Sequence, residues 1–183
     1  MSSKPTITPL TSLSVSRHLI PATSKAPNTS IQQKPLLIYH SVFSSTYTTA
    51  IERHLRDTAV VVPQWRYTMY DMSHYHSTTH EVLCVSHGRA RLCFGGEDNP
   101  ERVESVVCTG DVIIVPAGVA HCLLEDIDGA FEMVGSYPPG KAWDMCYGRP
   151  GEEGAYENIA ALAWFDKDPI YGDSGPVLDH VTD

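Results

Sequence analysis

Short apolar runs, broken by turn residues, dominate the middle of the sequence. Val, Ile, Leu, Phe and Cys cluster in runs of strand length, and Gly, Asn and Asp separate them, for example at Gly95-Gly96 and Asp128-Gly129. Closely spaced short strands with turn signals between them are typical of an antiparallel barrel or sandwich. We therefore predict strands at 65–72, 82–87, 89–94, 102–107, 111–115, 122–125 and 131–136.

The flanks of this region carry fewer elements. The apolar spacing between residues 44 and 57 fits one face of a helix, and a second short helix is predicted near 157–163. Two further short strands are predicted at 17–20 and 36–39.

The length of 183 residues favours one domain with a sizeable core. Residues 1–16 are rich in Ser, Thr and Pro and are predicted to form a flexible arm. The domain is expected to cover 17–183, with the barrel core at about 64–136 and a Gly- and Pro-rich tail, 137–183, that wraps the barrel.

Two histidine-bearing stretches together suggest one metal site. In the first, His74 and His76 lie two residues apart, and a strand directs alternate side chains to the same face. Glu81 would fall on the opposite face of an unbroken strand. The hydroxyl-rich segment Ser77-Thr78-Thr79 can supply a kink or bulge that turns Glu81 back towards the histidines.

The second stretch lies further along the chain. The predicted strand at 111–115 leads into Pro116-Ala117-Gly118, which favours a tight turn, and His121 opens the returning strand. This turn brings the imidazole of His121 back towards the first stretch. His74, His76, Glu81 and His121 are our four candidate metal ligands.

Three neutral imidazoles and one carboxylate suit Fe(II), Mn(II), Co(II), Ni(II), Cu(II) or Zn(II), and they suit calcium poorly. On an octahedral ion, four protein ligands would leave two positions for a bidentate substrate or for substrate and dioxygen, whereas a closed structural zinc site leaves none. We expect one divalent transition-metal ion, with Fe(II) favoured. The alternative is a barrel that has lost its metal and binds a ligand directly with the same residues.

The stretches 74–88 and 110–121 resemble the two conserved motifs of the cupin family, each with its internal spacing intact. The resemblance implies a mainly β fold, a double-stranded β-helix (jelly-roll) barrel with one or two short flanking helices. It also places the four candidate ligands at the positions that usually bind a metal. Thr68 and Glu125 stand where the family often has a glycine and an asparagine, but neither position is a ligand.

A closer resemblance, over about residues 17–178, links the chain to a subgroup of single-domain cupins, the YjlB-type proteins of bacteria and fungi. It is carried by the stretches 74–83, 134–138 and 168–172, together with Trp143-Asp144. The resemblance implies no particular reaction.

Counting back from the first histidine with a period of two predicts which side chains line the pocket. Met72, Tyr70, Thr68 and Arg66 share the histidine face if the strand is regular. Arg66 would then hold a substrate carboxylate with Met72 beside it, and Tyr70 would donate a proton. The alternative for Arg66 and Tyr70 is packing and surface solvation.

His80 neighbours Glu81 and must point elsewhere if Glu81 binds a metal. We list it with Tyr70 as a catalytic candidate, because it could move a proton or orient a ligand by a hydrogen bond. The alternative is a contact with the backbone or with solvent at the kink.

The formal net charge of −9 gives no electrostatic basis for binding nucleic acid or an anionic membrane. No apolar run reaches the roughly 18 residues that span a bilayer, and the N-terminus lacks a secretory signal core. We expect a cytoplasmic protein that binds a small-molecule substrate and forms a homodimer. The first 51 residues contain four Lys or Arg and no Asp or Glu, which keeps a mitochondrial location as a minor alternative.

Five cysteines without a Cys-x-x-Cys pair indicate reduced thiols, most of them acting as small apolar core residues.

Three functions fit these features. The first is a metal-dependent enzyme acting on a small organic metabolite, with a mononuclear oxygenase favoured. The second is a non-redox isomerase, dehydratase, cyclase or decarboxylase that uses the metal as a Lewis acid. The third is a non-enzymatic protein that binds a small ligand or a metal. Fold alone does not rank them.

Overall fold

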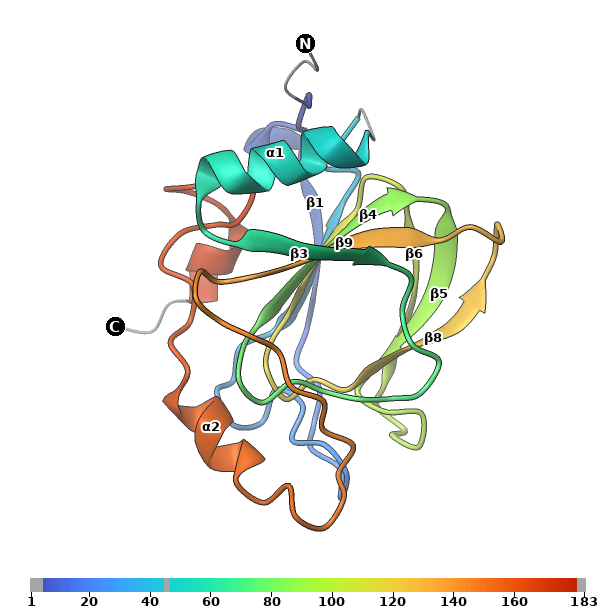
Figure 1. Cartoon of the computed structure of the whole chain (residues 1–183), viewed down its shortest axis with the longest axis vertical. Coiled ribbons are helices and arrows are strands. Elements are labelled where there is room, and N and C mark those ends of the chain that lie inside the picture. Colours follow the sequence, from blue (N-terminus) through green and yellow to red (C-terminus); the bar gives the residue numbers. More distant parts are fainter. Residues whose placement is uncertain (1–4, 45–46, 181–183) are drawn as a thin grey trace.

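Two antiparallel sheets make up most of the structure, a computed structural model that describes residues 5–44 and 47–180 (Figure 1). The strands are β1 (Ser14–His18), β2 (Leu36–His40), β3 (Val62–Tyr67), β4 (Glu81–His87), β5 (Arg89–Phe94), β6 (Val103–Cys108), β7 (Val112–Val115), β8 (His121–Asp126) and β9 (Glu132–Tyr137). The helices are α1 (Thr48–Thr58) and α2 (Ala155–Ala161), with the 3-10 turns η1 (Leu10–Ser12) and η2 (Pro176–His180).

The larger sheet has six strands in the order β1-β2-β7-β4-β9-β3, and the smaller has three in the order β6-β5-β8. Neighbouring strands pair antiparallel throughout. This is the mainly β jelly-roll barrel with few helices that the sequence predicted, and that prediction is confirmed.

Strand β4 shows how the sequence specifies two apolar layers. Leu83 and Val85 pack in the core between the two sheets, whereas Val82 and Cys84 pack in a second cluster on the outer face of the larger sheet. Alternate side chains of a strand point to opposite faces, and both faces of β4 are covered. The strand therefore reads as a nearly continuous apolar run rather than as a polar alternation.

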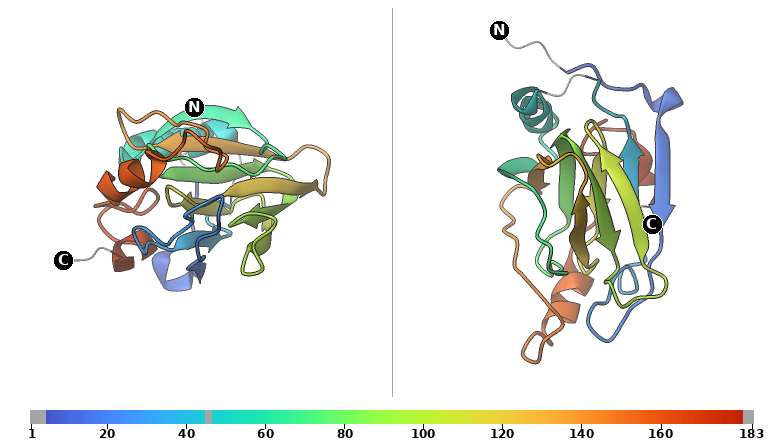
Figure 2. Two further views of the ribbon diagram at one scale, coloured as in Figure 1. Left: turned by 90° about the horizontal axis from the view of Figure 1, so that it is seen from below. Right: turned by 90° about the vertical axis from the view of Figure 1, so that its right-hand side faces the viewer.

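The outer cluster is covered by α1 and by the tail. Ile51 and Leu55 of α1 lie in it, together with Phe165, Ile170 and Val177 of the C-terminal segment. Helices α1 and α2 lie near opposite ends of the barrel (Figures 1 and 2). Neither helix, nor any other among the described residues, is long and apolar enough to cross a membrane.

All five cysteines are free thiols in the structure, and all but Cys108 are buried. Cys84 has only apolar surroundings, and burial raises its thiol pKa. This agrees with the role of small core residues predicted for them.

The N-terminal arm predicted at 1–16 is corrected for the part that the structure describes. The strand expected at 17–20 begins earlier, at Ser14, and pairs along its whole length with β2. Upstream of it, the Thr8 amide donates to the Val42 carbonyl and the Ser44 amide donates to the Thr6 carbonyl, at 2.8 and 3.1 Å. Polar side chains did not prevent this segment from pairing its backbone.

Strand β3 also differs from the prediction. It was expected at 65–72 but covers Val62–Tyr67, with a register shift against β9 between Pro63 and Trp65. Proline lacks the N–H that the ladder requires, and bulges form at such positions. Because β3 ends at Tyr67, the regular alternation expected from Arg66 to His74 is interrupted.

Candidate metal centre

A backbone bridge between distant segments places His74 and His121 opposite each other. The His121 amide donates to the His74 carbonyl at 2.8 Å, and the His74 amide donates to the His121 carbonyl at 3.2 Å. Residues directly opposite in an antiparallel pair bring their side chains together on one face. The centroids of the two imidazole rings lie 4.4 Å apart.

His76 joins them from two residues further along, on the same face. The Gly118 amide donates to the His76 carbonyl at 2.9 Å, which ties the first stretch to the turn that precedes His121. Gly118 has a φ of +92°, a conformation that favours glycine. The tight turn predicted at Pro116-Ala117-Gly118 is confirmed by the Val119 amide, which donates to the Pro116 carbonyl at 3.1 Å.

A kink separates His76 from Glu81, as predicted, and Asp144 holds it. The Asp144 carboxylate accepts from the Ser77 amide at 2.7 Å and from the Thr78 amide at 3.3 Å, and it also accepts from both hydroxyls. The kink returns Glu81 to the barrel interior, where it precedes Leu83 and Val85 on the same face of β4.

Hydrogen bonds fix the same tautomer on all three histidines. Each Nδ1 lies against a backbone carbonyl: that of Met72 for His74 and that of Val119 for His121, both at 2.9 Å, and that of Asp144 for His76. With Nδ1–H donating, each Nε2 carries the lone pair when the ring is neutral. The three rings each offer one nitrogen, and these atoms lie within 4.8 Å of one another in buried surroundings.

The Glu81 carboxylate completes the group. Its Oε1 accepts from the Tyr137 hydroxyl at 2.6 Å, and the Tyr137 oxygen accepts from the Trp65 indole N–H at 2.8 Å. Its Oε2 is buried without a hydrogen-bond partner and lies 3.5 Å from His76 Nε2 and 3.4 Å from His121 Nε2. A buried carboxylate oxygen facing imidazole lone pairs fits a shared cation, and the donor set fits a divalent transition metal.

The protonation of the cluster follows from burial and from Glu81. Burial lowers the pKa of His74, and burial together with the neighbouring His74 lowers the pKa of His121 to about 3. Burial acts on His76 in the same direction, but the Glu81 carboxylate outweighs it and raises the pKa of His76. Burial alone would raise the pKa of Glu81, but His76 and His121 lower it to about 2.

These directions predict how metal affinity changes with pH. A bound imidazole must be neutral, and His76 is the ligand histidine with a raised pKa, so metal binding should release one proton at a pH below that raised pKa. The apparent affinity should rise by about tenfold per pH unit up to the raised pKa of His76 and then level off. Calorimetry in buffers of different ionisation enthalpy counts the protons. Release of two or more would show that His74 or His121 is also protonated in the metal-free protein.

No sequence pattern indicates that Asp144 supports the kink. Replacing it with alanine removes the carboxylate that accepts hydrogen bonds from Ser77 and Thr78, and we expect metal affinity to fall by about 10- to 100-fold, as for other groups that orient ligands. Asp144→Asn keeps one acceptor oxygen and should lose less. A competition titration against a chelating dye measures both variants. Unchanged affinity in Asp144→Ala would show that the kink holds without the carboxylate.

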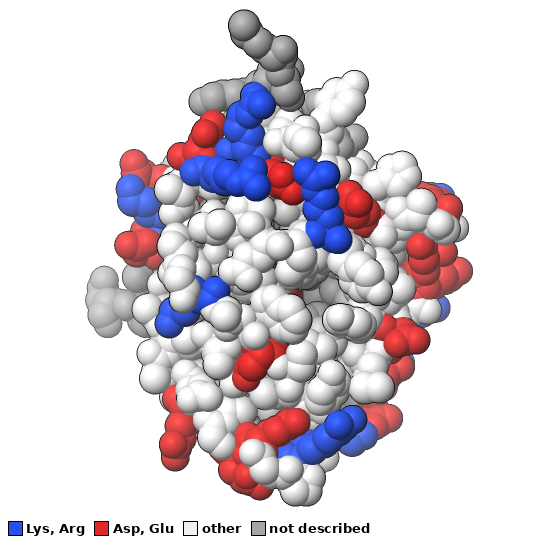
Figure 3. All heavy atoms as spheres, in the orientation of Figure 1, with Lys and Arg blue, Asp and Glu red and all other residues white. Residues whose placement is uncertain are grey.

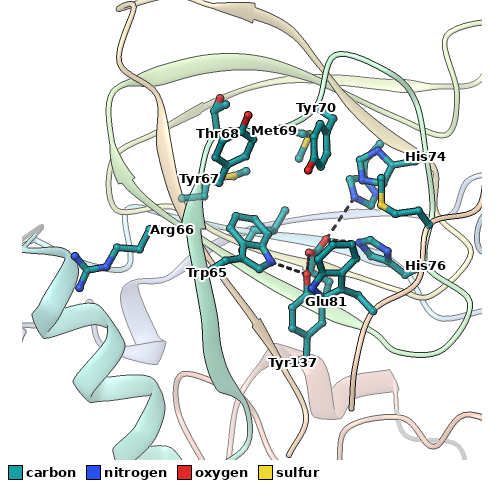
Figure 4. A pocket seen from close by; sticks show the side chains of 15 residues that line it. Trp65, Arg66, Tyr67, Thr68, Met69, Tyr70, His74, His76, Glu81 and Tyr137 are labelled. Carbon is teal, nitrogen blue, oxygen red and sulfur yellow. Dashed lines mark hydrogen bonds and ion pairs between the residues drawn. The ribbon is translucent and has the colours of Figure 1, made fainter. Parts of the chain in front are cut away.

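A cavity of about 230 Å³ lies in front of the candidate ligands. Its walls are mainly aromatic, aliphatic and thioether side chains (Figure 4). The lining residues are Trp65, Arg66, Tyr67, Thr68, Met69, Tyr70, His74, His76, Glu81, Leu83, His121, Met133, Tyr137, Trp143 and Met145.

Two of the four other predicted site residues line this cavity. Tyr70 is half exposed at its rim, with its ring centroid 5.7 Å from that of His74. Arg66 also belongs to the lining, but its guanidinium pairs with Glu52 of α1 at 2.6 Å and points away from the cavity (Figure 4). The carboxylate-binding role predicted for Arg66 is therefore not supported by its position.

The predictions for Met72 and His80 are corrected. Met72 is exposed and lines a separate surface groove, because the strand that would have aligned it ends at Tyr67. His80 is buried on the opposite side of the chain from Glu81, where its Nδ1 accepts from the Ala117 amide at 2.9 Å and its ring packs on Trp164. Burial lowers the pKa of His80 to about 4, so it is a neutral structural residue.

Comparisons with known proteins agree with this site and fold. The profile of the cupin family matches residues 42–135. The uncharacterised protein YjlB of Bacillus subtilis is 33% identical over 148 residues, which cover 79% of this chain and 84% of that protein.

Solved structures show weaker likeness. Procruciferin of Brassica napus has 12% identity and a TM-score of 0.37, over 62% of this chain and 22% of that chain. Acireductone dioxygenase of Bacillus anthracis has 16% identity and a TM-score of 0.40, over 54% of this chain and 65% of that chain. This chain therefore spans less than two thirds of either protein, and neither likeness bears on the reaction. The family profile and the Bacillus subtilis relative show that the chain belongs to the cupin family.

Proposed function

We propose that this cupin is a metal-dependent enzyme that acts on a small organic metabolite, most favourably as a mononuclear oxygenase. One observation supports the proposal above all: three Nε2 lone pairs and the unpartnered Glu81 Oε2 converge at the wall of an apolar cavity. A buried structural zinc site would have no such cavity beside it.

His74, His76, Glu81 and His121 would hold one divalent ion, with Fe(II) favoured and Zn, Mn, Ni, Co or Cu also compatible with the donor set. A redox-active ion supplies electron transfer to dioxygen when bound, and a redox-inert ion supplies Lewis acidity. The protein's own part is to hold the ligands, to shape the cavity and to exclude water.

The composition of the cavity favours the oxygenase over the non-redox alternative. Proton-transfer chemistry requires an acid or a base within hydrogen-bond reach of the substrate. Among the described lining residues, the four candidate ligands are the only imidazoles and carboxylates, and no lysine is present. With His80 outside the cavity, Tyr70 is the proton donor that remains from the predicted pair, and a Lewis-acid enzyme would depend on it.

Loading the metal-free protein with Fe(II) or Zn(II) separates the alternatives. Each form is incubated with a panel of enolic, phenolic and carboxylic compounds, while dioxygen uptake and substrate loss are followed. The oxygenase proposal expects dioxygen uptake with Fe(II) only. Turnover with Zn(II) under nitrogen would favour the Lewis-acid enzyme, and ligand binding without turnover in either form would favour a binding protein.

The cytoplasmic location and the homodimer remain predictions. Size-exclusion chromatography with light scattering would measure the mass of the particle in solution and decide the second.

A further inference from the structure

The walls of the cavity define what it can accept. Apart from the candidate ligands, they consist of aromatic rings, three thioethers, one leucine, one threonine and one arginine. The rings of Tyr67, Tyr70 and Trp143 are 52%, 50% and 41% exposed, and these rings continue the apolar wall to the molecular surface. Figure 3 shows this face as largely uncharged in its middle, with charged side chains gathered near α1 and at the margins. Such walls favour a flat apolar molecule.

The polar atoms of two lining rings, those of Trp65 and Tyr137, are already used. The Trp65 indole N–H donates to Tyr137, and the Tyr137 hydroxyl donates to Glu81. Both rings therefore present carbon to the cavity and offer no hydrogen to a substrate. The part of the wall that these two rings form, next to Glu81, has little to offer a strongly polar group.

The walls also lack a positive charge that is free to pair with a substrate. Arg66 is the one cationic side chain among the described lining residues, and its guanidinium pairs with Glu52 outside the cavity, at 2.6 Å. Glu52 is itself mostly buried, with a side chain that is 14% exposed, so the pair is partly shielded from water. A substrate carboxylate would find no free cation on these walls.

The charge of the proposed metal site then sets the charge of the substrate. A divalent ion together with Glu81 and three neutral histidines carries one net positive charge. A ligand with one negative charge neutralises it, whereas a ligand with two leaves an unpaired charge in an apolar cavity, which is strongly unfavourable.

Size gives a further constraint. An apolar cavity of about 150 Å³ holds benzene, so 230 Å³ fits one substituted ring, with longer substituents reaching the exposed rim. We propose that the substrate of this site is a planar, mostly apolar, singly charged compound with two adjacent oxygens, such as a hydroxylated ring ketone, and not a dicarboxylate. This inference rests on the proposed metal site.

Two probes of similar binding geometry and different charge test it. Tropolone is a flat, singly charged ring with two adjacent oxygens, and oxalate carries two charges and no ring. The full chain is loaded with Co(II), its metal content is measured, and each probe is titrated while the visible absorption of the ion is followed. We expect tropolone to bind on the order of 100-fold more tightly than oxalate, the effect of one unpaired buried charge.

Wall variants make the test specific. Tyr70→Ala should weaken tropolone binding by about 3- to 10-fold through lost ring contact, without loss of cobalt. Met145→Lys adds a cation to a half-buried wall position, so it should lower the ratio of tropolone affinity to oxalate affinity. Met145→Leu adds no charge and should leave this ratio unchanged.

The outcomes are distinguishable. If the protein binds no cobalt, the proposed function fails and this inference fails with it. If cobalt binds and the affinity for oxalate equals or exceeds that for tropolone, the metal site stands and the inference on substrate charge is overturned. The same holds if cobalt binds and neither probe changes the spectrum.

Discussion

We expect Glu81→Gln to abolish tight metal binding while the barrel stays folded. The substitution keeps the size of the side chain and the oxygen that accepts from Tyr137. It removes the charge and replaces the unpartnered Oε2, which lies 3.5 Å from His76 Nε2 and 3.4 Å from His121 Nε2, by an uncharged NH₂ group that cannot bind a metal. Metal affinity should fall by at least about 100-fold, the upper end of what the loss of a group that only supports a ligand causes.

The metal-free variant should lose little stability. Glu81 is charged in the fold because His76 and His121 lower its pKa to about 2 against the effect of burial. When the charge is removed, His76 can release its proton, so no buried charge is left unpaired. We expect the free energy of unfolding of the metal-free protein to change by less than about 2 kcal/mol.

Thermal unfolding with and without added metal measures both effects at once. The wild type should be stabilised by metal, and Glu81→Gln should not. Glu125→Gln is the matched control, because Glu125 lies on β8, the strand that His121 opens, but is exposed and outside the cavity. If Glu81→Gln keeps wild-type metal affinity, the carboxylate is not a ligand and the three histidines bind alone.

Gly135→Ala should be among the most destabilising single substitutions in the barrel. Gly135 on β9 pairs directly with Trp65 on β3, and a Cβ at position 135 would fall within the Trp65 ring. The ring cannot move freely, because its N–H donates to Tyr137 at 2.8 Å. Overpacking and the loss of this hydrogen bond together should lower the free energy of unfolding by about 2–4 kcal/mol.

The same substitution should also weaken metal binding. Displacing Trp65 loosens Tyr137, whose hydroxyl orients the Glu81 carboxylate at 2.6 Å, so metal affinity should also fall. Urea denaturation and a metal titration measure the two effects. Gly154→Ala is the control, since a Cβ there meets open space and the φ of −67° is ordinary.

A double-mutant cycle identifies the cause. Trp65→Leu removes the clashing ring, so the added cost of Gly135→Ala should largely disappear in the Trp65→Leu background. Full destabilisation by Gly135→Ala in that background would mean that the ring is not the cause.

The sequence predicted the parts of the site that depend on local geometry. The spacing of His74 and His76, the turn before His121 and the kink at Ser77-Thr78-Thr79 each follow from a short stretch of chain, and each was found as predicted. Alternation along β4 also explains why Glu81 faces the cavity and the preceding residue, His80, does not. The same alternation argues against the catalytic role predicted for His80, whose ring lies against the Ala117 amide.

The site residues that could not be predicted are those whose positions depend on contacts between distant parts of the chain. A period of two from His74 back to Arg66 requires one regular strand, but β3 ends at Tyr67. The Arg66 guanidinium therefore pairs with Glu52 of α1, and Met72 lines another groove. The chain of contacts from Trp65 through Tyr137 to Glu81, and the support of the kink by Asp144, join residues that are more than 50 positions apart. No local pattern indicates such pairs.

Metal content is the measurement that tests the central claim most directly. Elemental analysis is carried out on protein purified without added metal, for the wild type and for the His76→Ala, His121→Ala double variant. The account predicts close to one divalent transition-metal ion per wild-type chain and none in the double variant. If neither protein carries metal, and added Fe(II), Mn(II), Ni(II) or Zn(II) fails to raise the unfolding temperature of the wild type, the four residues do not form a metal site and the account is contradicted.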